Sequence, residues 1–115
     1  MTGIVFFATE QLETVLEFYT DRVGAEVQLT QPGCTILRYE NLLVGFCDRD
    51  TTDTDGIVTF VYDDIESVDE KYRDLDDIAT DQPHENTEYR IYQFFATDPD
   101  GRTIEFQTFL HETDF

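Results

Sequence analysis

The chain contains the same strand-plus-helix pattern twice, at an offset of 53 residues. Residues 3–22 read GIVFFATEQLETVLEFYTDR and residues 56–75 read GIVTFVYDDIESVDEKYRDL, with nine of the twenty aligned positions identical. Each copy opens on a glycine and an apolar run, and then changes to the apolar spacing of a helix. Self-similarity at a fixed offset is the signature of a repeated structural unit. The sequence therefore predicts two related modules.

The composition indicates a folded protein with a strongly acidic surface. The chain has 115 residues, 40% of them hydrophobic and 14% aromatic, which is enough for a core that needs no disulfide or metal. It carries 26 acidic and 7 basic residues, so that its formal net charge is -19. Nucleic acids and anionic membranes are themselves negatively charged, so neither is expected as a partner.

The acidic excess resembles the composition of proteins from extreme halophiles. Lys71 is the only lysine of the chain. In molar salt the Debye length falls to about 3 Å, so a surface of hydrated carboxylates is well screened, whereas its self-repulsion destabilises the fold at low salt. The sequence shows neither a signal peptide nor a long apolar segment, and a cytoplasmic protein is expected.

The first module is expected to span residues 1–48 with the order β-α-β-β-β. Its expected elements are a strand at 3–9, a helix at 11–23, a strand at 25–30 and a hairpin at 34–47. Gly24 is placed to end the helix. Glu40 and Asn41 form the expected two-residue turn of the hairpin, because Asn tolerates the left-handed conformation that such turns require.

Residues 49–55, RDTTDTD, contain no hydrophobic side chain and are interpreted as an acidic linker between the modules. Alternating carboxylates also occur in calcium-binding loops. This run, however, has neither the central glycine nor the terminal glutamate of an EF-hand. Calcium binding is therefore not expected here.

The second module, residues 56–110, repeats the order of the first. Its expected elements are a strand at 57–62, a helix at 64–74, a weak strand at 78–80, a polar loop at 82–87 and strands at 88–97 and 102–109. Asp64 is suited to cap the helix, and the DPDG sequence at 98–101 forms the last turn. Neither module can cover both faces of its own sheet, so residues 1–115 are expected to form one domain.

Two sequence stretches, together with the paired modules, resemble the vicinal oxygen chelate superfamily. They are LETVLEFYTDRVGAEV at residues 12–27 and FFATDPDGRTIEFQ at residues 94–107. The superfamily includes glyoxalase I, extradiol dioxygenases and the bleomycin-resistance proteins. The resemblance implies an α+β fold in which two tandem modules form a curved, mixed sheet of eight strands around a ligand cleft, and usually a homodimer.

The resemblance also implies a divalent metal in the cleft, held by residues on the first, fifth and eighth strands and often on the fourth. The corresponding residues of this chain are Ile4, Ile57, Glu105 and Gly45. Only Glu105 can bind a metal, and a catalytic cation needs about three protein ligands. The sequence therefore predicts no bound metal and no cofactor.

Strand alternation predicts which side chains line the cleft. If Ile4 faces the cleft, Phe6 and its repeat counterpart Thr59 do so too. A register with Thr97 opposite Arg102 gives the pairs Phe94 with Glu105, Tyr92 with Gln107 and Arg90 with Phe109. The predicted ligand-binding residues are Phe6, Arg38, Thr59, Arg90, Tyr92, Phe94, Glu105 and Gln107.

Glu105 is the best candidate for a chemical role among these residues. It is either a general base or an anchor for a cationic ligand group, or the partner of Arg38 or Arg90 in a structural ion pair. The ion pair is the favoured interpretation because no metal is expected.

The cysteines and histidines are not expected to be functional. The register of the first hairpin sets Cys34 directly opposite Cys47, at a pair of the close-approach type, so a disulfide is compatible with the geometry. Cytosolic thiols are normally reduced, however, and free thiols are expected. His84 falls in a predicted loop and His111 in the tail, and both are interpreted as surface residues.

Three functions remain open. The favoured hypothesis is a metal-independent protein that binds a small, aromatic or cationic molecule, as in the bleomycin-resistance branch. The second is a glyoxalase- or dioxygenase-like enzyme that uses Glu105 with an atypical metal site. The third is a structural or regulatory protein whose cleft is filled by its own aromatic residues, with Phe6 and Phe94 as the residues that would fill it.

Overall fold

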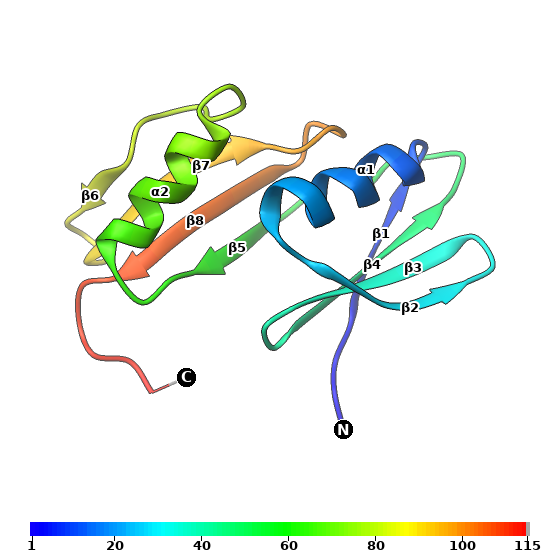
Figure 1. Cartoon of the computed structure of the whole chain (residues 1–115), viewed down its shortest axis with the longest axis horizontal. Coiled ribbons are helices and arrows are strands. Elements are labelled where there is room, and N and C mark those ends of the chain that lie inside the picture. Colours follow the sequence, from blue (N-terminus) through cyan, green and yellow to red (C-terminus); the bar gives the residue numbers. More distant parts are fainter. Residues whose placement is uncertain (115) are drawn as a thin grey trace. The chain divides into compact units, whose positions relative to one another are not determined.

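A computed structural model describes residues 1–114 and contains the order β-α-β-β-β twice (Figure 1). The first set is β1 (Val5–Thr9), α1 (Leu12–Phe18) prolonged by a π-helical turn η1 (Tyr19–Val23), β2 (Glu26–Gln31), β3 (Cys34–Tyr39) and β4 (Leu42–Asp48). The second set is β5 (Ile57–Val61), α2 (Ile65–Leu75), β6 (His84–Asn86), β7 (Ile91–Thr97) and β8 (Thr103–Phe109).

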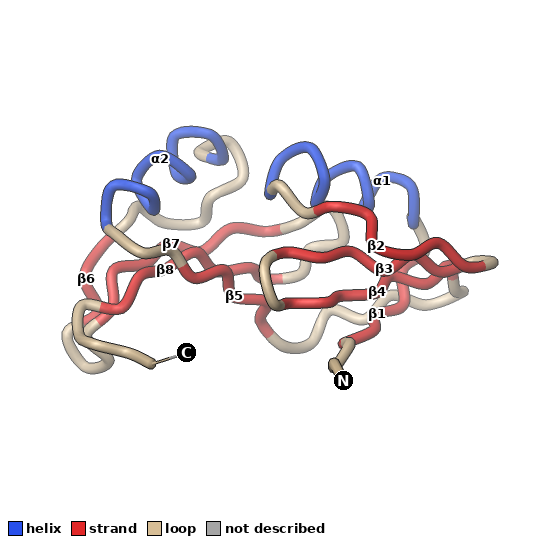
Figure 2. Tube along the Cα trace, turned by 60° about the horizontal axis from the view of Figure 1, so that its bottom comes forward, coloured by secondary structure: helices blue, strands red, loops and turns tan. Residues whose placement is uncertain are grey.

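The strands form two four-stranded sheets, in the orders β1-β4-β3-β2 and β5-β8-β7-β6. The pairs β1–β4 and β5–β8 are parallel and the other pairs are antiparallel. In each set the helix lies over one face of its own sheet (Figure 2). Neither α-helix of the described residues is long and apolar enough to cross a membrane. The predicted α+β fold of two repeated modules is confirmed, with its eight strands divided between two sheets.

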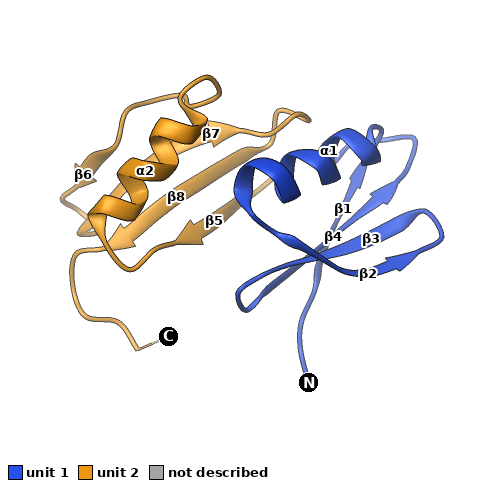
Figure 3. Ribbon diagram, in the orientation of Figure 1, with its two compact units in different colours: residues 1–54 blue, residues 55–115 orange. Residues whose placement is uncertain are grey.

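The chain divides into two compact units, unit 1 (Met1–Thr54) and unit 2 (Asp55–Phe115) (Figure 3). The segment expected as a linker, 49–55, is hydrogen-bonded to β1. Asp53 accepts a hydrogen bond from the backbone N–H of Ala8 at 2.8 Å and donates its own N–H to the carbonyl of Ala8 at 3.0 Å. β1 is an edge strand, so its outward backbone groups need partners, and this segment supplies them.

Unit 1 buries an aromatic cluster between its helix and its sheet. Tyr19 stacks on Phe46 of β4 with ring centroids 5.0 Å apart, and Phe7 of β1 stacks on the same ring at 5.9 Å. Val15 of α1 and Leu37 of β3 are fully buried. Because strand side chains alternate, the neighbours of these residues in β1, β3 and β4 point to the opposite face of the sheet.

The first helix differs from the expected range of 11–23. It is α-helical only over Leu12–Phe18, and then widens into the π-helical turn Tyr19–Val23. The N–H of Gly24 donates to the carbonyl of Tyr19, five residues earlier, at 3.0 Å. Gly24 has φ of 100° and ends the helix, as its position in the sequence predicts.

Unit 2 has the same construction. Phe94 of β7 stacks on Phe106 of β8 with centroids 5.1 Å apart, and Tyr72 of α2 meets Phe94 edge-on at 5.3 Å. Asp64 caps α2, as predicted, by accepting a hydrogen bond from the N–H of Ser67 at 2.8 Å. Hydrogen bonding from Ser67 lowers the pKa of the Asp64 carboxyl.

The segment between α2 and β7 differs from the expectation. The predicted polar loop at 82–87 contains the strand β6 (His84–Asn86), which pairs with β7. An edge strand can be held by its backbone bonds alone, so its polar side chains give no apolar pattern to detect. The weak strand predicted at 78–80 is reduced to an isolated bridge between Ala79 and Ala96.

Candidate functional site

The turn between β7 and β8 sets the register of the candidate site. Thr97 pairs with Thr103 and not with Arg102, and the N–H of Asp98 donates to the carbonyl of Arg102 at 3.0 Å. The turn is therefore one residue longer than expected, and a shift of one residue moves every side chain of β7 to the other face. The resulting pairs are Phe95 with Glu105, Gln93 with Gln107 and Ile91 with Phe109.

The side chain of Arg102 explains the length of this turn. It is fully buried, and its guanidinium pairs with Asp98 at 2.5 Å and with Asp100 at 3.2 Å. The carboxylate of Asp98 also accepts hydrogen bonds from the N–H groups of Asp100 and Arg102. A buried cation must be paired, and this ion-pair cluster fixes the loop geometry, which counting residues across the turn does not reveal.

Three of the residues predicted to line the site lie elsewhere as a result of this register. Phe94 is fully buried in the core under α2. The hydroxyl of Tyr92 donates to Asp69 of α2 at 2.7 Å, and this bond, with burial, raises the pKa of Tyr92 to about 12. Arg90 lies in the turn before β7, at φ of 55°. Their placement opposite the β8 residues named above is wrong.

The face of unit 2 opposite α2 carries a polar cluster around Glu105. This residue is only 8% exposed. Its Oε1 accepts a hydrogen bond from the hydroxyl of Thr59 at 2.9 Å, and its Oε2 accepts one from Nε2 of Gln93 at 2.9 Å. Thr59 is also the partner of Glu105 in the β5–β8 register. The expected ion pair with Arg38 or Arg90 is not found in residues 1–114, since both hydrogen-bond partners of Glu105 are neutral.

Two buried amide oxygens lie on the same face and have no hydrogen-bond partner in the described structure. They are Oε1 of Gln93, which is 3% exposed, and Oε1 of Gln107, which is 8% exposed. A carboxylate only accepts hydrogen bonds, so Gln93 must present its NH₂ group to Glu105 and leave its oxygen unpaired. An unsatisfied buried polar group costs about 1–3 kcal/mol. Thr59, Gln93, Glu105 and Gln107 are called the acceptor cluster below.

Gln93 is the member of the acceptor cluster that the sequence reasoning missed. The sequence does contain a signal for Gln93. If Asp98 and Arg102 are taken as the pair that closes the turn, counting back along both strands sets Gln93 opposite Gln107. Thr59, Glu105 and Gln107, by contrast, lie on one sheet face as strand alternation predicts.

A hollow of about 350 Å³ lies near one end of this face. Its lining includes Val61, the register partner of Gln107, and Phe109, which follows Gln107 by two residues on β8. The rest of its lining is polar and consists of Tyr62, Asp63, Thr108, the exposed His111 and Thr113. The volume falls in the range of small-molecule sites, and the hollow is lined by strand neighbours of the acceptor cluster rather than by its members.

The corresponding face of unit 1 has an apolar pair at the matching position. Phe6 of β1 is the register partner of Gly45 on β4, and its ring covers the glycine. A β-carbon at position 45 would overlap ring atoms Cδ1 and Cε1 of Phe6. Ile4, which precedes β1, is 38% exposed. The pair Phe6–Gly45 in unit 1 thus takes the place that Thr59–Glu105 takes in unit 2.

The residues at these positions do not fit a divalent metal site. The resemblance implies ligands at Ile4, Gly45, Ile57 and Glu105. In the observed register Phe6 lies opposite Gly45 and Thr59 lies opposite Glu105, so these two residues replace Ile4 and Ile57. Neither adds a carboxylate, imidazole or thiolate. Among residues 1–114 no group of three or more His, Cys, Asp and Glu side chains is placed to hold a metal ion.

Arg38 lies apart from the acceptor cluster, in unit 1. Its Nε donates to Gln28 and its Nη1 to the carbonyl of Glu40, each at 3.0 Å. It borders a second hollow, of about 450 Å³, at the turn of the β3–β4 hairpin. Glu40 and not Asn41 takes the left-handed conformation in this turn, at φ of 53°.

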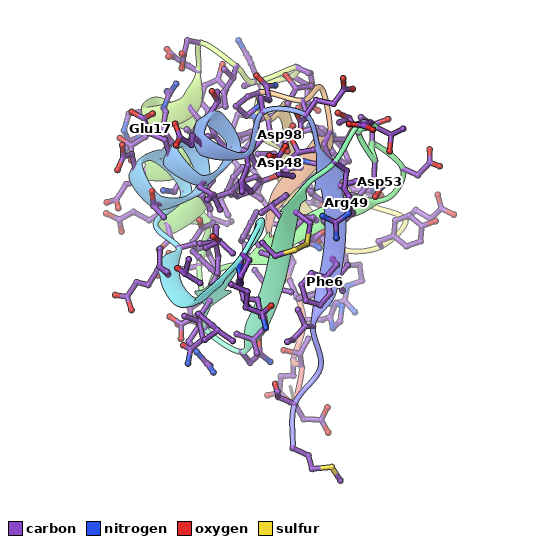
Figure 4. All side chains as sticks on the ribbon, turned by 90° about the vertical axis from the view of Figure 1, so that its right-hand side faces the viewer. Phe6, Glu17, Asp48, Arg49, Asp53 and Asp98 are labelled. Atoms are coloured by element: carbon purple, nitrogen blue, oxygen red, sulfur yellow. A yellow bond between two sulfur atoms is a disulfide. The ribbon has the colours of Figure 1, made fainter. Side chains whose placement is uncertain are left out.

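Cys34 and Cys47 form a disulfide, contrary to the expectation of free thiols. The two residues are paired as the hairpin register predicts, with Cα atoms 4.1 Å apart. Nη2 of Arg49 lies 3.9 Å from the sulfur of Cys34. Figure 4 shows the side chain of Arg49 and, in yellow, the disulfide bond. The hairpin register therefore predicts this pair correctly, and the expectation of free thiols is wrong.

Comparisons with known proteins identify the fold. No family model and no curated protein matches the sequence. The structure is similar to a glyoxalase/bleomycin resistance protein/dioxygenase from Nocardioides (15% identity, TM-score 0.77, 99% of this chain and 86% of that one). It is also similar to an integron cassette protein from the Halifax Harbour sewage outfall (17%, 0.81, 94% and 97%) and to a lactoylglutathione lyase from Agrobacterium tumefaciens (20%, 0.76, 94% and 92%). These likenesses confirm the fold that the two sequence stretches imply.

Proposed function

We propose that this protein, which has the fold of the glyoxalase/bleomycin resistance/dioxygenase proteins, is a metal-independent small-molecule-binding protein. The observation that carries the proposal is the contrast between the two units. Unit 1 covers Gly45 with the ring of Phe6, and unit 2 keeps one carboxylate, Glu105, bonded to neutral partners. One carboxylate cannot hold a catalytic cation.

The ligand is proposed to bind on the face of unit 2 opposite α2. The acceptor cluster supplies polar groups at fixed positions. The hollow near it supplies space, and its lining combines Val61 and Phe109 with several polar side chains. An apolar concavity with a few convergent polar groups is the usual form of a small-molecule site. Of the residues predicted from the sequence, Thr59, Glu105 and Gln107 remain in this proposal.

The two alternatives have less support. A general base needs a second catalytic group or an activated substrate near it, and the groups bonded to Glu105 are a hydroxyl and an amide. Of the two aromatic residues named for a filled cleft, Phe94 belongs to the core under α2, and Phe6 covers Gly45 in unit 1.

We also propose that the protein is a cytoplasmic homodimer. Light scattering in 3 M KCl tests the homodimer by measuring the mass of the particle in solution.

A fragment screen tests the proposal. Protein treated with EDTA is titrated with a library of monocyclic fragments in 3 M KCl, and the side-chain amide resonances of Gln93 and Gln107 are followed by NMR. We expect saturable shifts of these resonances with at least one fragment. No shift with any fragment, or shifts that require added zinc, nickel or iron, would overturn the proposal.

A further inference from the structure

We infer that the acceptor cluster recognises the primary ammonium group of a small organic cation. This inference rests on the proposed function and specifies its ligand class. The cluster presents three groups that accept hydrogen bonds: the carboxylate of Glu105, and the amide oxygens of Gln93 and Gln107. A primary ammonium carries three N–H donors and no acceptor. The donors of the ligand therefore match the acceptors of the protein in number and in kind.

The hydrogen bonds within the cluster orient these acceptors. Thr59 donates to one oxygen of Glu105 and the NH₂ group of Gln93 to the other, so the carboxylate is fixed from both sides. The amide oxygen of Gln93 is bonded to the same carbon as this NH₂ group, so the hydrogen bond to Glu105 also restricts the position of this oxygen. Gln107 is the cross-strand partner of Gln93 and presents its own oxygen on the same face.

The charge of the cluster favours a cation over a neutral donor. Glu105 is a buried carboxylate, and neither of its hydrogen-bond partners is charged. A buried charge is costly unless an opposite charge compensates it. An ammonium group satisfies this requirement, whereas an alcohol does not and a carboxylate would be repelled.

The apolar residues around the acceptor cluster indicate the chemistry of the remaining part of the ligand. Phe95 is the cross-strand partner of Glu105, and Val61 is the β5 partner of Gln107. Both apolar side chains lie on the face of the acceptor cluster, and Val61 also lines the hollow of about 350 Å³. A cation with a short aliphatic or single-ring substituent would place its apolar part against these residues.

Matched ligands test the inference. Benzylammonium, benzyl alcohol and benzoate have nearly the same shape and differ in charge. Each is titrated into the protein in 3 M KCl, and the amide resonances of Gln93 and Gln107 report binding. We expect benzylammonium to bind at least tenfold more tightly than benzyl alcohol, and benzoate not to bind. Equal affinity for the ammonium and the alcohol, or preference for benzoate, would overturn the ligand class while leaving small-molecule binding in place.

Variants connect the effect to the cluster. Glu105→Gln removes the charge at nearly constant shape and should weaken benzylammonium binding at least tenfold, while Gln107→Met removes one acceptor and should weaken it severalfold. Glu85→Gln is the matched control, because it removes one charge from β6, where Glu85 pairs with Tyr92 away from the cluster face. Equal loss of binding in Glu105→Gln and Glu85→Gln would contradict the inference. Absence of binding by all three ligands, and by the whole fragment library, would instead contradict the proposed function.

Discussion

The ring of Phe6 covers Gly45 across the β1–β4 pair, so that no side chain can stand at position 45 while the ring keeps its place. This contact lies where the resemblance implies a metal ligand on the fourth strand. The observed position of the Phe6 ring in unit 1 therefore requires glycine at position 45.

The Phe6–Gly45 contact predicts a coupled pair of substitutions. Gly45→Ala should lower the free energy of unfolding by about 1 kcal/mol, because the added methyl group forces the ring out of its place. The same substitution in a Phe6→Ala background should cost much less, because the ring is gone. Chemical denaturation of the four proteins of this cycle measures the coupling. An equal cost of Gly45→Ala in both backgrounds would contradict the contact.

The disulfide between Cys34 and Cys47 predicts a dependence of stability on reductant. It closes a loop with a sequence separation of 13, and a bond of this span stabilises a fold by about 3 kcal/mol. A reductant should therefore lower the unfolding midpoint of the wild-type protein. The Cys34→Ala/Cys47→Ala variant is the control, and its midpoint should not respond to reductant. Two free thiols per chain in protein purified without reductant would show that the bond does not form.

The hydrogen bond from Tyr92 to Asp69 predicts a change in stability at high pH. The pKa of Tyr92 is raised to about 12 in the folded protein, against about 10 for an unperturbed tyrosine. Its contribution to stability is therefore fully present below about pH 10 and is lost as the pH rises through about 12.

Absorbance at 295 nm, which follows tyrosine ionisation, checks this prediction. Asp69→Asn should move the titration of one tyrosine to lower pH, because the anionic acceptor that holds the proton is removed. Tyr92→Phe should remove that same step from the curve. Identical titration curves for the wild-type protein and Asp69→Asn would show that Asp69 does not hold the proton.

The net charge predicts that the fold requires salt. The 26 acidic residues repel one another at low ionic strength, and molar salt screens this repulsion. The thermal unfolding midpoint should therefore be higher in 3 M than in 0.1 M KCl. Equal midpoints in the two solutions would refute the proposal of a halophilic protein.

The sequence predicts the modules of this fold better than it predicts the details of the site. Apolar periodicity and the repeat locate both helices, and Gly24 and Asp64 act at the helix ends as their residue types indicate. Strand alternation also places Thr59 with Glu105. These features depend on local pattern, which a single sequence contains.

The errors come from interactions between residues that no local pattern describes. The buried pairing of Arg102 with Asp98 lengthens one turn, and this exchanges Phe94 for Phe95 and Tyr92 for Gln93 on the face of the candidate site. The disulfide depends on a bond that hairpin register allows but does not require. The two contacts span four and thirteen residues, and neither changes the apolar pattern from which the strands were predicted.

We propose that this chain binds its ligand without a metal, and the metal content of the purified protein tests this proposal most directly. The protein is purified in 3 M KCl, dialysed against the same solution without chelator, and analysed for zinc, nickel, iron and manganese by mass spectrometry. We predict far less than one metal ion per chain, because Glu105 is the only ligating side chain at the positions that the fold provides. One equivalent of any of these metals retained through dialysis would contradict the account.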